Sequence, residues 1–406
     1  MKLTPAGHRA FPFHLAAVVL LALFVAACSS DGEAEPSREA SPEQPSAAPS
    51  DEAGQASDAI APASRDAPTP LPRSGPARPY ALGFTATPAV LTPDAYVDVF
   101  DEAALRADVI MIQRPVAWTE VRPGGSISPS TRATIEWERQ LIADRGLDLL
   151  FAIDPWQAAN RGRLAGEAPG EGFRDASVTR DYVAYAEFVV REYRPRWLAL
   201  AVDLDAVARS RPEDLDAIEA AYRRAYAAVK AIAPETRIFA TFQLEDLQGL
   251  LPWSTHTPQW SLLLRFDDVL DVLAVSSFPS LIFPFASDIP DTYYSRLDAF
   301  QKPVALVPSG FASAPGRNGV TFGTVRGQQQ FLRRVLAEAE AGAWELVVWI
   351  SPDDPAFATE PPFDLFAQMG MRAAGGVEKP AWSVWVQSAI RPWQPAPAEG
   401  AGAATD

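Results

Sequence analysis

Cysteine and histidine are scarce in this chain of 406 residues. Cys28 is the only cysteine, so no disulfide can form within one chain. The histidines are His8, His14 and His256, and neither an HExxH motif nor a nucleophile elbow occurs. These absences disfavour a histidine-based metal site and a Ser-His-Asp triad, and His256 is expected to be an ordinary loop residue. A glycine-rich phosphate loop is also missing, and the sequence predicts neither a metal nor another cofactor.

Basic residues are outnumbered by acidic ones. The chain has 35 Lys and Arg residues against 51 Asp and Glu residues, a formal net charge of -16 at pH 7. Such an acidic chain is repelled by nucleic acid and by anionic lipid head groups. We therefore expect no nucleic acid among its partners.

The N-terminus has the pattern of a secretory signal. Lys2 and Arg9 precede an apolar stretch from Phe11 to Val25, shorter than the ~20 residues that span a bilayer. The four residues ending at Cys28 read Val-Ala-Ala-Cys and resemble the lipobox of bacterial lipoproteins. The resemblance implies that Cys28 is acylated and that a lipid holds the protein in the cell envelope. Because Ser29 is not the aspartate that favours inner-membrane retention, an outer membrane is expected where the cell has one. A chance cysteine after an ordinary cleavage site is the alternative.

Composition divides the chain into four parts. Residues 1–27 are the predicted signal peptide. Residues 28–77 are rich in Ser, Ala, Pro and Glu and cannot bury enough apolar surface to offset the entropy of ordering, so they are expected to be a disordered tether. Residues 78–393 are long enough for one large domain, and residues 394–406 form a low-complexity tail.

Eight apolar runs of strand length recur along the domain and mostly do not alternate with polar residues. This pattern indicates strands that are buried on both faces. Amphipathic segments lie between the runs, including Tyr182–Tyr193, Ala217–Ile232 and Gln328–Ala341. Their alternation predicts an α/β fold, a (β/α)8 TIM barrel, with a doubly wound open sheet as the alternative. The runs are Tyr80–Thr87, Ala107–Arg114, Gly146–Asp154, Arg196–Leu204, Thr236–Gln243, Asp271–Phe278, Lys302–Pro308 and Trp344–Ser351.

Carboxylates and tryptophans follow these predicted strands. In a barrel the strand ends meet at one mouth, which is where catalytic groups sit. Sugar rings stack on aromatic rings and their hydroxyls need acceptors, so this composition indicates a carbohydrate site, unless the aromatic residues only cap the barrel core. The predicted ligand-binding residues are Arg114, Trp118, Asp154, Trp156, Asp205, Gln243, Phe278, Ser309, Phe311 and Trp349.

The sequence also resembles an enzyme family over nearly all of the domain. The segments WLALAVDLDAVARSRPEDLD, VLAVSSFPS, KPVALVPSGF and ELVVWISPDD are similar, in this order, to strands four, six, seven and eight of clan A glycoside hydrolases. The barrels related to arabinogalactan endo-β-1,4-galactanases match best. The resemblance implies a (β/α)8 barrel acting on a β-glycan. It also implies that a strand-four motif, Gly-x-Glu-x-Asn in the family, reads Ala201-Val202-Asp203-Leu204-Asp205 here, with Asp203 at the acid/base position.

This sequence departs from the family pattern at the positions that carry chemistry. Retaining glycosidases need two carboxyl groups about 5 to 5.5 Å apart. The nucleophile position falls on Pro308, while Phe278 replaces a tyrosine and Phe311 replaces a tryptophan of the family. Ser309 has no histidine or lysine nearby in the sequence to activate it. The departures remove polar chemistry and keep shape.

The sequence is compatible with three functions. One is a lipid-anchored envelope protein whose barrel mouth binds a glycan or related small ligand, with lost or altered hydrolytic activity. Another is an active hydrolase with Asp203 as the acid and Glu245, Asp353 or Asp354 as a relocated second carboxylate, although Ser-Pro-Asp-Asp-Pro is also typical of a solvated turn. The third is a non-catalytic envelope interaction protein, which a closed barrel mouth would favour.

Overall fold

The computed structural model describes residues 65–395, except residues 255 and 318. The predicted signal peptide, the lipidation site Cys28 and most of the predicted tether and tail lie outside the described residues. Within those ranges, no helix is long and apolar enough to cross a bilayer.

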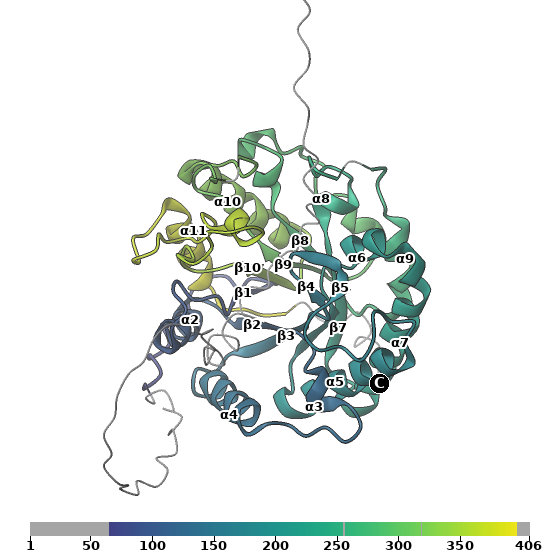
Figure 1. Ribbon diagram of the computed structural model, residues 1–406. Coiled ribbons are helices and arrows are strands. Elements are labelled where there is room, and N and C mark those ends of the chain that lie inside the picture. Colours follow the sequence, from purple (N-terminus) through teal and green to yellow (C-terminus); the bar gives the residue numbers. More distant parts are fainter. Residues whose placement is uncertain (1–64, 255, 318, 396–406) are drawn as a thin grey trace, which may run out of the picture.

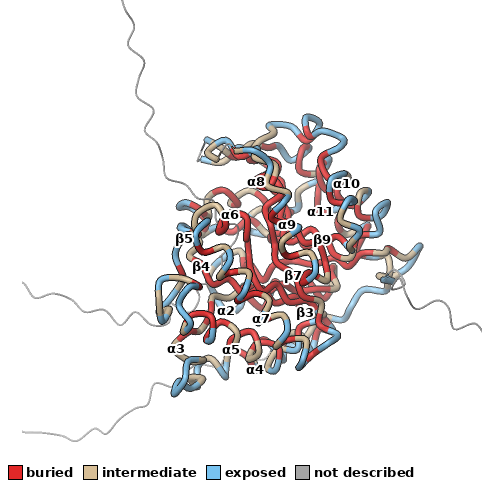
Figure 2. The backbone as a smooth tube through the Cα atoms, turned by 90° about the vertical axis from the view of Figure 1, so that its right-hand side faces the viewer, coloured by how far each residue is buried: buried red, intermediate tan, exposed pale blue. Residues whose placement is uncertain are grey.

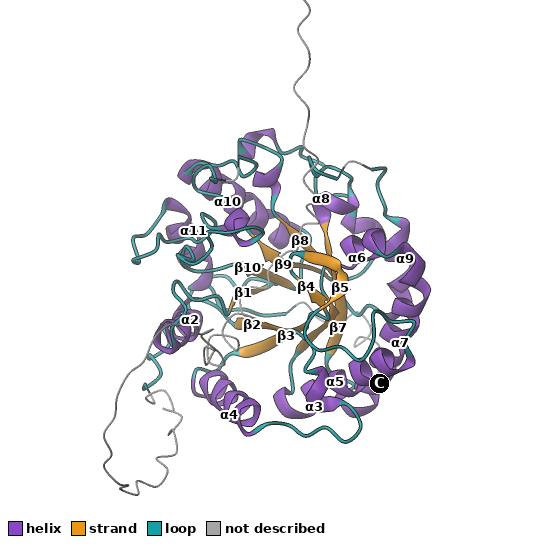
Figure 3. Cartoon of the chain, in the orientation of Figure 1, coloured by secondary structure: helices purple, strands orange, loops and turns teal. Residues whose placement is uncertain are grey.

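Eight parallel strands of the described chain close into a barrel in the order β1-β10-β9-β8-β7-β6-β3-β2, and helices surround it (Figures 1 and 3). This confirms the predicted (β/α)8 barrel. Each strand coincides with one predicted apolar run, because each is buried against both the barrel interior and the helix layer. The strands are β1 (Ala81–Thr85), β2 (Val109–Arg114), β3 (Asp148–Ile153), β6 (Trp197–Ala201), β7 (Arg237–Gln243), β8 (Leu273–Ser277), β9 (Val304–Ser309) and β10 (Leu346–Trp349).

The helices begin and end at residues with the expected local chemistry. Thr92 and Thr324 accept hydrogen bonds from the backbone amides of Ala95 and Gly327, and so cap α2 and α10. The predicted helix Ala217–Ile232 lies within α7. The helices are α2 (Pro93–Arg106), α3 (Trp118–Val121), α4 (Pro129–Asp144), α5 (Ala176–Tyr193), α6 (Leu204–Ser210), α7 (Leu215–Ile232), α8 (Leu244–Leu247), α9 (Ser261–Phe266), α10 (Val325–Ala341) and α11 (Pro380–Ala389).

A short antiparallel hairpin, the β4–β5 hairpin, is inserted between β3 and α5. It consists of β4 (Trp156–Gln157) and β5 (Asn160–Leu164) and does not belong to the barrel. In the view along the barrel it crosses in front of the strands, and in the view turned by 90° it lies at the edge of the molecule (Figures 1 and 2). Figure 2 also shows that buried residues concentrate along the strands and on the sides of the helices that face them.

Residues 65–77, which composition assigns to the tether, lie against the barrel. Arg73 Nη1 is 2.6 Å from Asp108 Oδ1, just before β2, and the Ser74 amide donates to the Ile390 carbonyl. Arg78 forms a parallel bridge with Trp393. The ordered domain therefore begins earlier than composition indicated.

Candidate functional site

Five polar side chains from neighbouring strands form what we call the inner polar ring. Side chains alternate between the two faces of a strand. Arg114 contacts the helix layer, which places its neighbour Gln113 on the interior side. Likewise, Phe242 packs on Phe266 of α9, which places Gln243 on the interior side. The ring sits at the carboxyl ends of β2, β3, β6, β7 and β8 and is almost fully buried. Its members are Gln113, Asp154, Asp203, Gln243 and Ser276.

Arg161 of the β4–β5 hairpin reaches into the ring. Its Nη1 lies 3.0 and 2.8 Å from the two oxygens of Asp154, and its Nη2 donates to the Val202 carbonyl. The Gln113 amide nitrogen donates to Asp154 Oδ2 at 3.0 Å. Burial raises the pKa of Asp154, although Arg161 and its hydrogen bonds oppose that rise. The positive charge of the Arg161 guanidinium therefore compensates the negative charge of the Asp154 carboxylate.

Asp203 is held at the turn between β6 and α6. Its backbone is left-handed (φ 48°, ψ 52°), which aspartate tolerates better than most residues, and its amide donates to Thr241 Oγ1 at 3.1 Å. Asp203 Oδ2 lies 3.9 Å from Arg161 Nη2, and Ser276 Oγ lies 3.5 Å from Asp203 Oδ1. The candidate acid/base residue thus faces the barrel interior, as the strand-end argument predicted.

Asp205, two residues after Asp203, forms a buried acidic pair with Asp246. Asp205 Oδ1 accepts a hydrogen bond from the backbone N–H of Gln243 at 2.9 Å. Burial first, and then the neighbouring Asp246 and Asp203, raise the pKa of Asp205 well above its ordinary value. Asp246 is itself paired with Arg209, and His256 Nε2 lies 3.0 Å from Asp246 Oδ1. His256 is therefore a partner of a buried carboxylate rather than an isolated loop residue.

Three buried polar atoms of the ring residues and of Arg161 lack hydrogen-bond partners among the described residues. They are Gln113 Oε1, Gln243 Nε2 and Arg161 Nε. Gln113 is 8% exposed, and Gln243 and Arg161 are 1% and 0% exposed. Buried polar groups are normally hydrogen-bonded, so each such atom is a place where a water molecule or a ligand would be stabilised.

The end of β9, strand seven of the barrel, offers no acid-base group. Its last residues are Val307, Pro308 and Ser309, and the Ser309 hydroxyl donates to the Ser277 carbonyl at 2.9 Å. Ser309 is completely buried. No nucleophile is presented from this strand.

Glu245 lies in the layer between β8 and the loop that follows it. Its Oε1 accepts from the Ser277 hydroxyl (2.7 Å), the Phe278 amide (2.9 Å) and the Tyr293 hydroxyl (2.6 Å). Burial raises the pKa of Glu245, and these hydrogen bonds oppose the rise. None of the hydrogen bonds described for Glu245 joins it to the inner polar ring.

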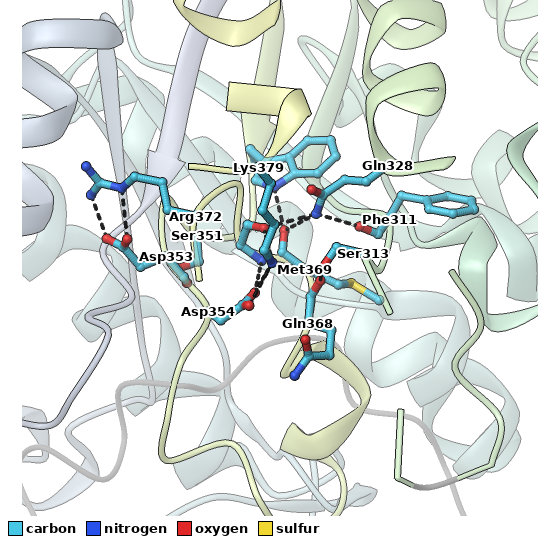
Figure 4. A network of polar contacts seen from close by, with 12 residues as sticks. Phe311, Ser313, Gln328, Ser351, Asp353, Asp354, Gln368, Met369, Arg372 and Lys379 are labelled. Atoms are coloured by element: carbon cyan, nitrogen blue, oxygen red, sulfur yellow. Dashed lines mark hydrogen bonds and ion pairs between the residues drawn. The ribbon is translucent and has the colours of Figure 1, made fainter. Parts of the chain in front are cut away.

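Asp353 and Asp354 follow β10 and hold the loop between β10 and α11 (Figure 4). Arg372 binds both oxygens of Asp353, at 2.8 and 2.7 Å. Lys379 Nζ lies 2.7 Å from both oxygens of Asp354, and the Gly370 amide donates to Asp354 at 2.9 Å. These carboxylates are fixed by ion pairs, unlike those of a solvated turn.

The predicted aromatic residues are buried in packing contacts, and Arg114 is partly buried. Trp118 and Trp349 donate their indole N–H to the carbonyls of Ala165 and Met369. Trp349 and Phe311 pack on Phe331 of α10, Phe278 packs on Phe366, and Trp156 packs on Phe173. Arg114 pairs with Glu138 of α4 in the helix layer. The structure therefore brings Asp154, Asp203 and Gln243 together, with Asp205 beside them, and places the aromatic side chains in the core.

Sequence reasoning missed Gln113, Arg161 and Asp246. Gln113 directly precedes Arg114 at the end of its run, so the alternation of side chains could have found it. Arg161 had no such signal, because it lies in a hairpin that no strand pattern predicted. No group of three or more His, Cys, Asp or Glu residues in the described part of the chain is arranged to hold a metal ion.

Comparisons with known proteins identify the fold and no closer relationship. No family model matches the sequence, and no curated protein matches it. An exo-beta-1,4-mannosidase from Opitutaceae bacterium strain TAV5 has a TM-score of 0.57 at 16% identity and covers 79% of this chain, while this chain spans only 60% of the mannosidase. A GH5_18 protein from Bifidobacterium longum subsp. longum ATCC 55813, in complex with Manb1-4GlcNAc, has a TM-score of 0.57 at 15% identity over 78% of this chain and 80% of that chain. At these identities the likeness is one of fold: the chain has a glycoside hydrolase-like barrel.

Proposed function

We propose that this protein is a lipid-anchored protein of the cell envelope whose barrel mouth binds a glycan, or a related hydroxyl-rich ligand, without hydrolysing it. The observation that carries the proposal is the end of β9, where Val307, Pro308 and Ser309 leave no carboxyl group opposite Asp203. Both glycosidase mechanisms need a second carboxyl group. Asp154, the other carboxylate of the ring, is bound by Arg161. The candidates Asp353 and Asp354 are fixed by ion pairs, and Glu245 is hydrogen-bonded outside the ring.

The unpartnered amide atoms support a hydroxyl-rich ligand. Gln113 offers an acceptor and Gln243 a donor. A hydroxyl group both donates and accepts, so one sugar ring can satisfy both kinds of atom. The GH5_18 protein in complex with Manb1-4GlcNAc supports a glycan as the class of ligand for a barrel of this shape.

The burial of the mouth favours a second candidate, a non-catalytic envelope protein that binds a protein partner elsewhere. Asp203 and Gln243 are each 1% exposed, and Trp349 is 0% exposed. A sugar cannot reach these residues unless part of the chain moves.

Calorimetry and hydrolysis assays on the chain from Ser29 onward separate these functions. We expect heat of binding from at least one polysaccharide of a β-glycan panel, no release of reducing sugar, and at least tenfold weaker binding after Gln243→Ala, which removes one buried hydrogen-bonding group. Gln140→Ala, at an exposed glutamine of α4, is the matched control. Silence across the panel would support the second candidate. Turnover that Asp203→Ala abolishes would instead show an active hydrolase.

Anchoring is tested separately in cells. We expect the full chain to incorporate a fatty-acid label and to sediment with membranes, and Cys28→Ser to lose the label, because Cys28 is the only thiol available for acylation. A full chain that remains unlabelled and soluble would contradict the anchor.

A further inference from the structure

The β4–β5 hairpin covers the inner polar ring. It leaves the barrel after Asp154 and returns to α5, and both views place it at the mouth (Figures 1 and 2). Its base is fixed by packing, since Trp156 contacts Phe173 and the Trp118 indole donates to the Ala165 carbonyl. Its outer residues Asn160 and Arg163 are exposed. The hairpin therefore has a fixed base and a solvent-facing side.

One side chain of the hairpin ties it to the centre of the barrel. Arg161 is completely buried, binds both oxygens of Asp154 at 3.0 and 2.8 Å, donates to the Val202 carbonyl and lies 3.9 Å from Asp203 Oδ2. A single nitrogen, Nη1, lies near both carboxylate oxygens, and the charge of the guanidinium strengthens these hydrogen bonds. The weaker contact of Arg211 Nη1 with the Gly162 carbonyl, at 3.4 Å, lies on the outer side.

The closed position leaves polar atoms unpaired beneath the hairpin. Gln113 Oε1 and Gln243 Nε2 are buried without partners among the residues that the structure describes, and so is Arg161 Nε. Water or ligand hydroxyls would pair with these atoms if the hairpin moved away. Opening thus exchanges the Arg161 contacts for hydration of the ring.

We propose that the β4–β5 hairpin is a lid over the ligand site and that Arg161 is the latch that holds it closed. The role of the site as a ligand site rests on the proposed function, whereas the movement of the lid can be measured without any ligand. Release of Arg161 from Asp154 exposes the inner polar ring, and a ligand binds only to the open state.

Thiol labelling measures the opening directly. The chain from Ser29 onward contains no cysteine, so a single cysteine can be placed beneath the lid by Ser276→Cys, next to Asp203. Ser277→Cys is the matched control: it is equally buried, but its hydroxyl faces Glu245 and Tyr294 in the outer layer. The rate of modification by N-ethylmaleimide in native buffer reports how often each position is open.

We expect Arg161→Lys to accelerate labelling at position 276 at least tenfold and to leave position 277 unchanged, because lysine keeps the charge but has no second nitrogen for the Val202 carbonyl. Arg161→Met should accelerate it further. The exposed neighbour change Arg163→Lys should alter neither rate. Equal acceleration at both positions would indicate general loosening and would overturn the proposal, as would no acceleration at position 276. If the labelling results hold but no glycan binds even to the Arg161→Lys protein, the lid stands and the proposed function fails.

Discussion

Asp205 is a carboxyl group whose pKa is raised by its place in the fold. Burial and the neighbouring Asp246 and Asp203 raise its pKa well above its ordinary value, whereas an aspartate in the unfolded chain titrates near 3.9. Between about pH 4 and the raised pKa, the folded state binds a proton that the unfolded state has released. The contribution of Asp205 to stability is therefore lost as pH rises through this window.

Replacement of Asp205 by asparagine should remove this dependence. The asparagine side chain of Asp205→Asn keeps an oxygen that can accept the hydrogen bond from the backbone N–H of Gln243, but it cannot ionise. Measured by urea unfolding from pH 4 to 8, the free energy of unfolding of the variant relative to the wild type should increase with pH, by up to about 1.4 kcal/mol per pH unit. Asp94→Asn, at an exposed site in the first turn of α2, should run parallel to the wild type. Parallel curves for Asp205→Asn as well would show that Asp205 is ionised in the folded state.

Single residues also show where sequence reasoning reached the site. Asp154 and Asp203 follow buried strands and Gln243 is the last residue of β7, so the rule that strand ends meet at the mouth indicates where they lie. Trp349 and Ser309 also lie at strand ends, but neither side chain joins the inner polar ring. The Trp349 side chain packs on α10, and the Ser309 hydroxyl donates to the Ser277 carbonyl. The difference depends on the register of each strand, which shifts between β9 and its neighbours β8 and β10. Register is a property of strand pairing, and one sequence does not reveal it.

At the scale of elements, long apolar runs predicted the barrel strands because burial on both faces leaves an uninterrupted pattern. The β4–β5 hairpin left no such trace. Its residues Trp156 to Leu164 contain only two large apolar side chains, and the hairpin is held by Arg161 rather than by a continuous apolar face. Elements fixed by a few polar contacts are therefore the ones that pattern reasoning misses.

The loop between β10 and α11 depends on one buried ion pair. Lys379 and Asp354 are each 9% exposed, and Lys379 also donates to the Gly370 carbonyl at 2.8 Å (Figure 4). Burial lowers the pKa of Lys379 and raises that of Asp354, while the pair opposes both shifts. Lys379→Met leaves Asp354 buried without its counter-charge, which should cost about 3 kcal/mol in urea unfolding.

A double-mutant cycle tests this explanation. Adding Asp354→Leu to Lys379→Met removes the uncompensated charge and should recover a large part of the loss. Arg191→Met, which breaks the exposed pair with Glu187 on α5, should cost less than about 1 kcal/mol. Strictly additive losses in the double mutant would mean that the two side chains stabilise the loop independently.

At the scale of the whole molecule, the two ends of the described chain meet at the barrel end opposite the mouth. The Ser74 amide donates to the Ile390 carbonyl, and Arg78 forms a bridge with Trp393. Arg78 is 0% exposed and lies 2.6 Å from Asp108, which also pairs with Arg73. The segment before β1 thus contributes to the fold, although its composition of Pro, Ala and Ser resembles a linker.

Truncation from the N-terminus should therefore show a sharp boundary. A chain starting at Arg65 should melt at the same temperature as one starting at Ser29, whereas a chain starting at Pro79 should melt roughly 5 °C or more lower, because Asp108 loses both arginines in a site where only about a tenth of its side chain is exposed. Thermal unfolding followed by circular dichroism gives these temperatures. Arg65→Met, at an exposed pair with Asp98, is the control and should leave the melting temperature unchanged. Equal melting of all the truncated chains would show that the segment before Pro79 does not stabilise the domain, and the composition-based boundary at residue 78 would then mark its start to within one residue.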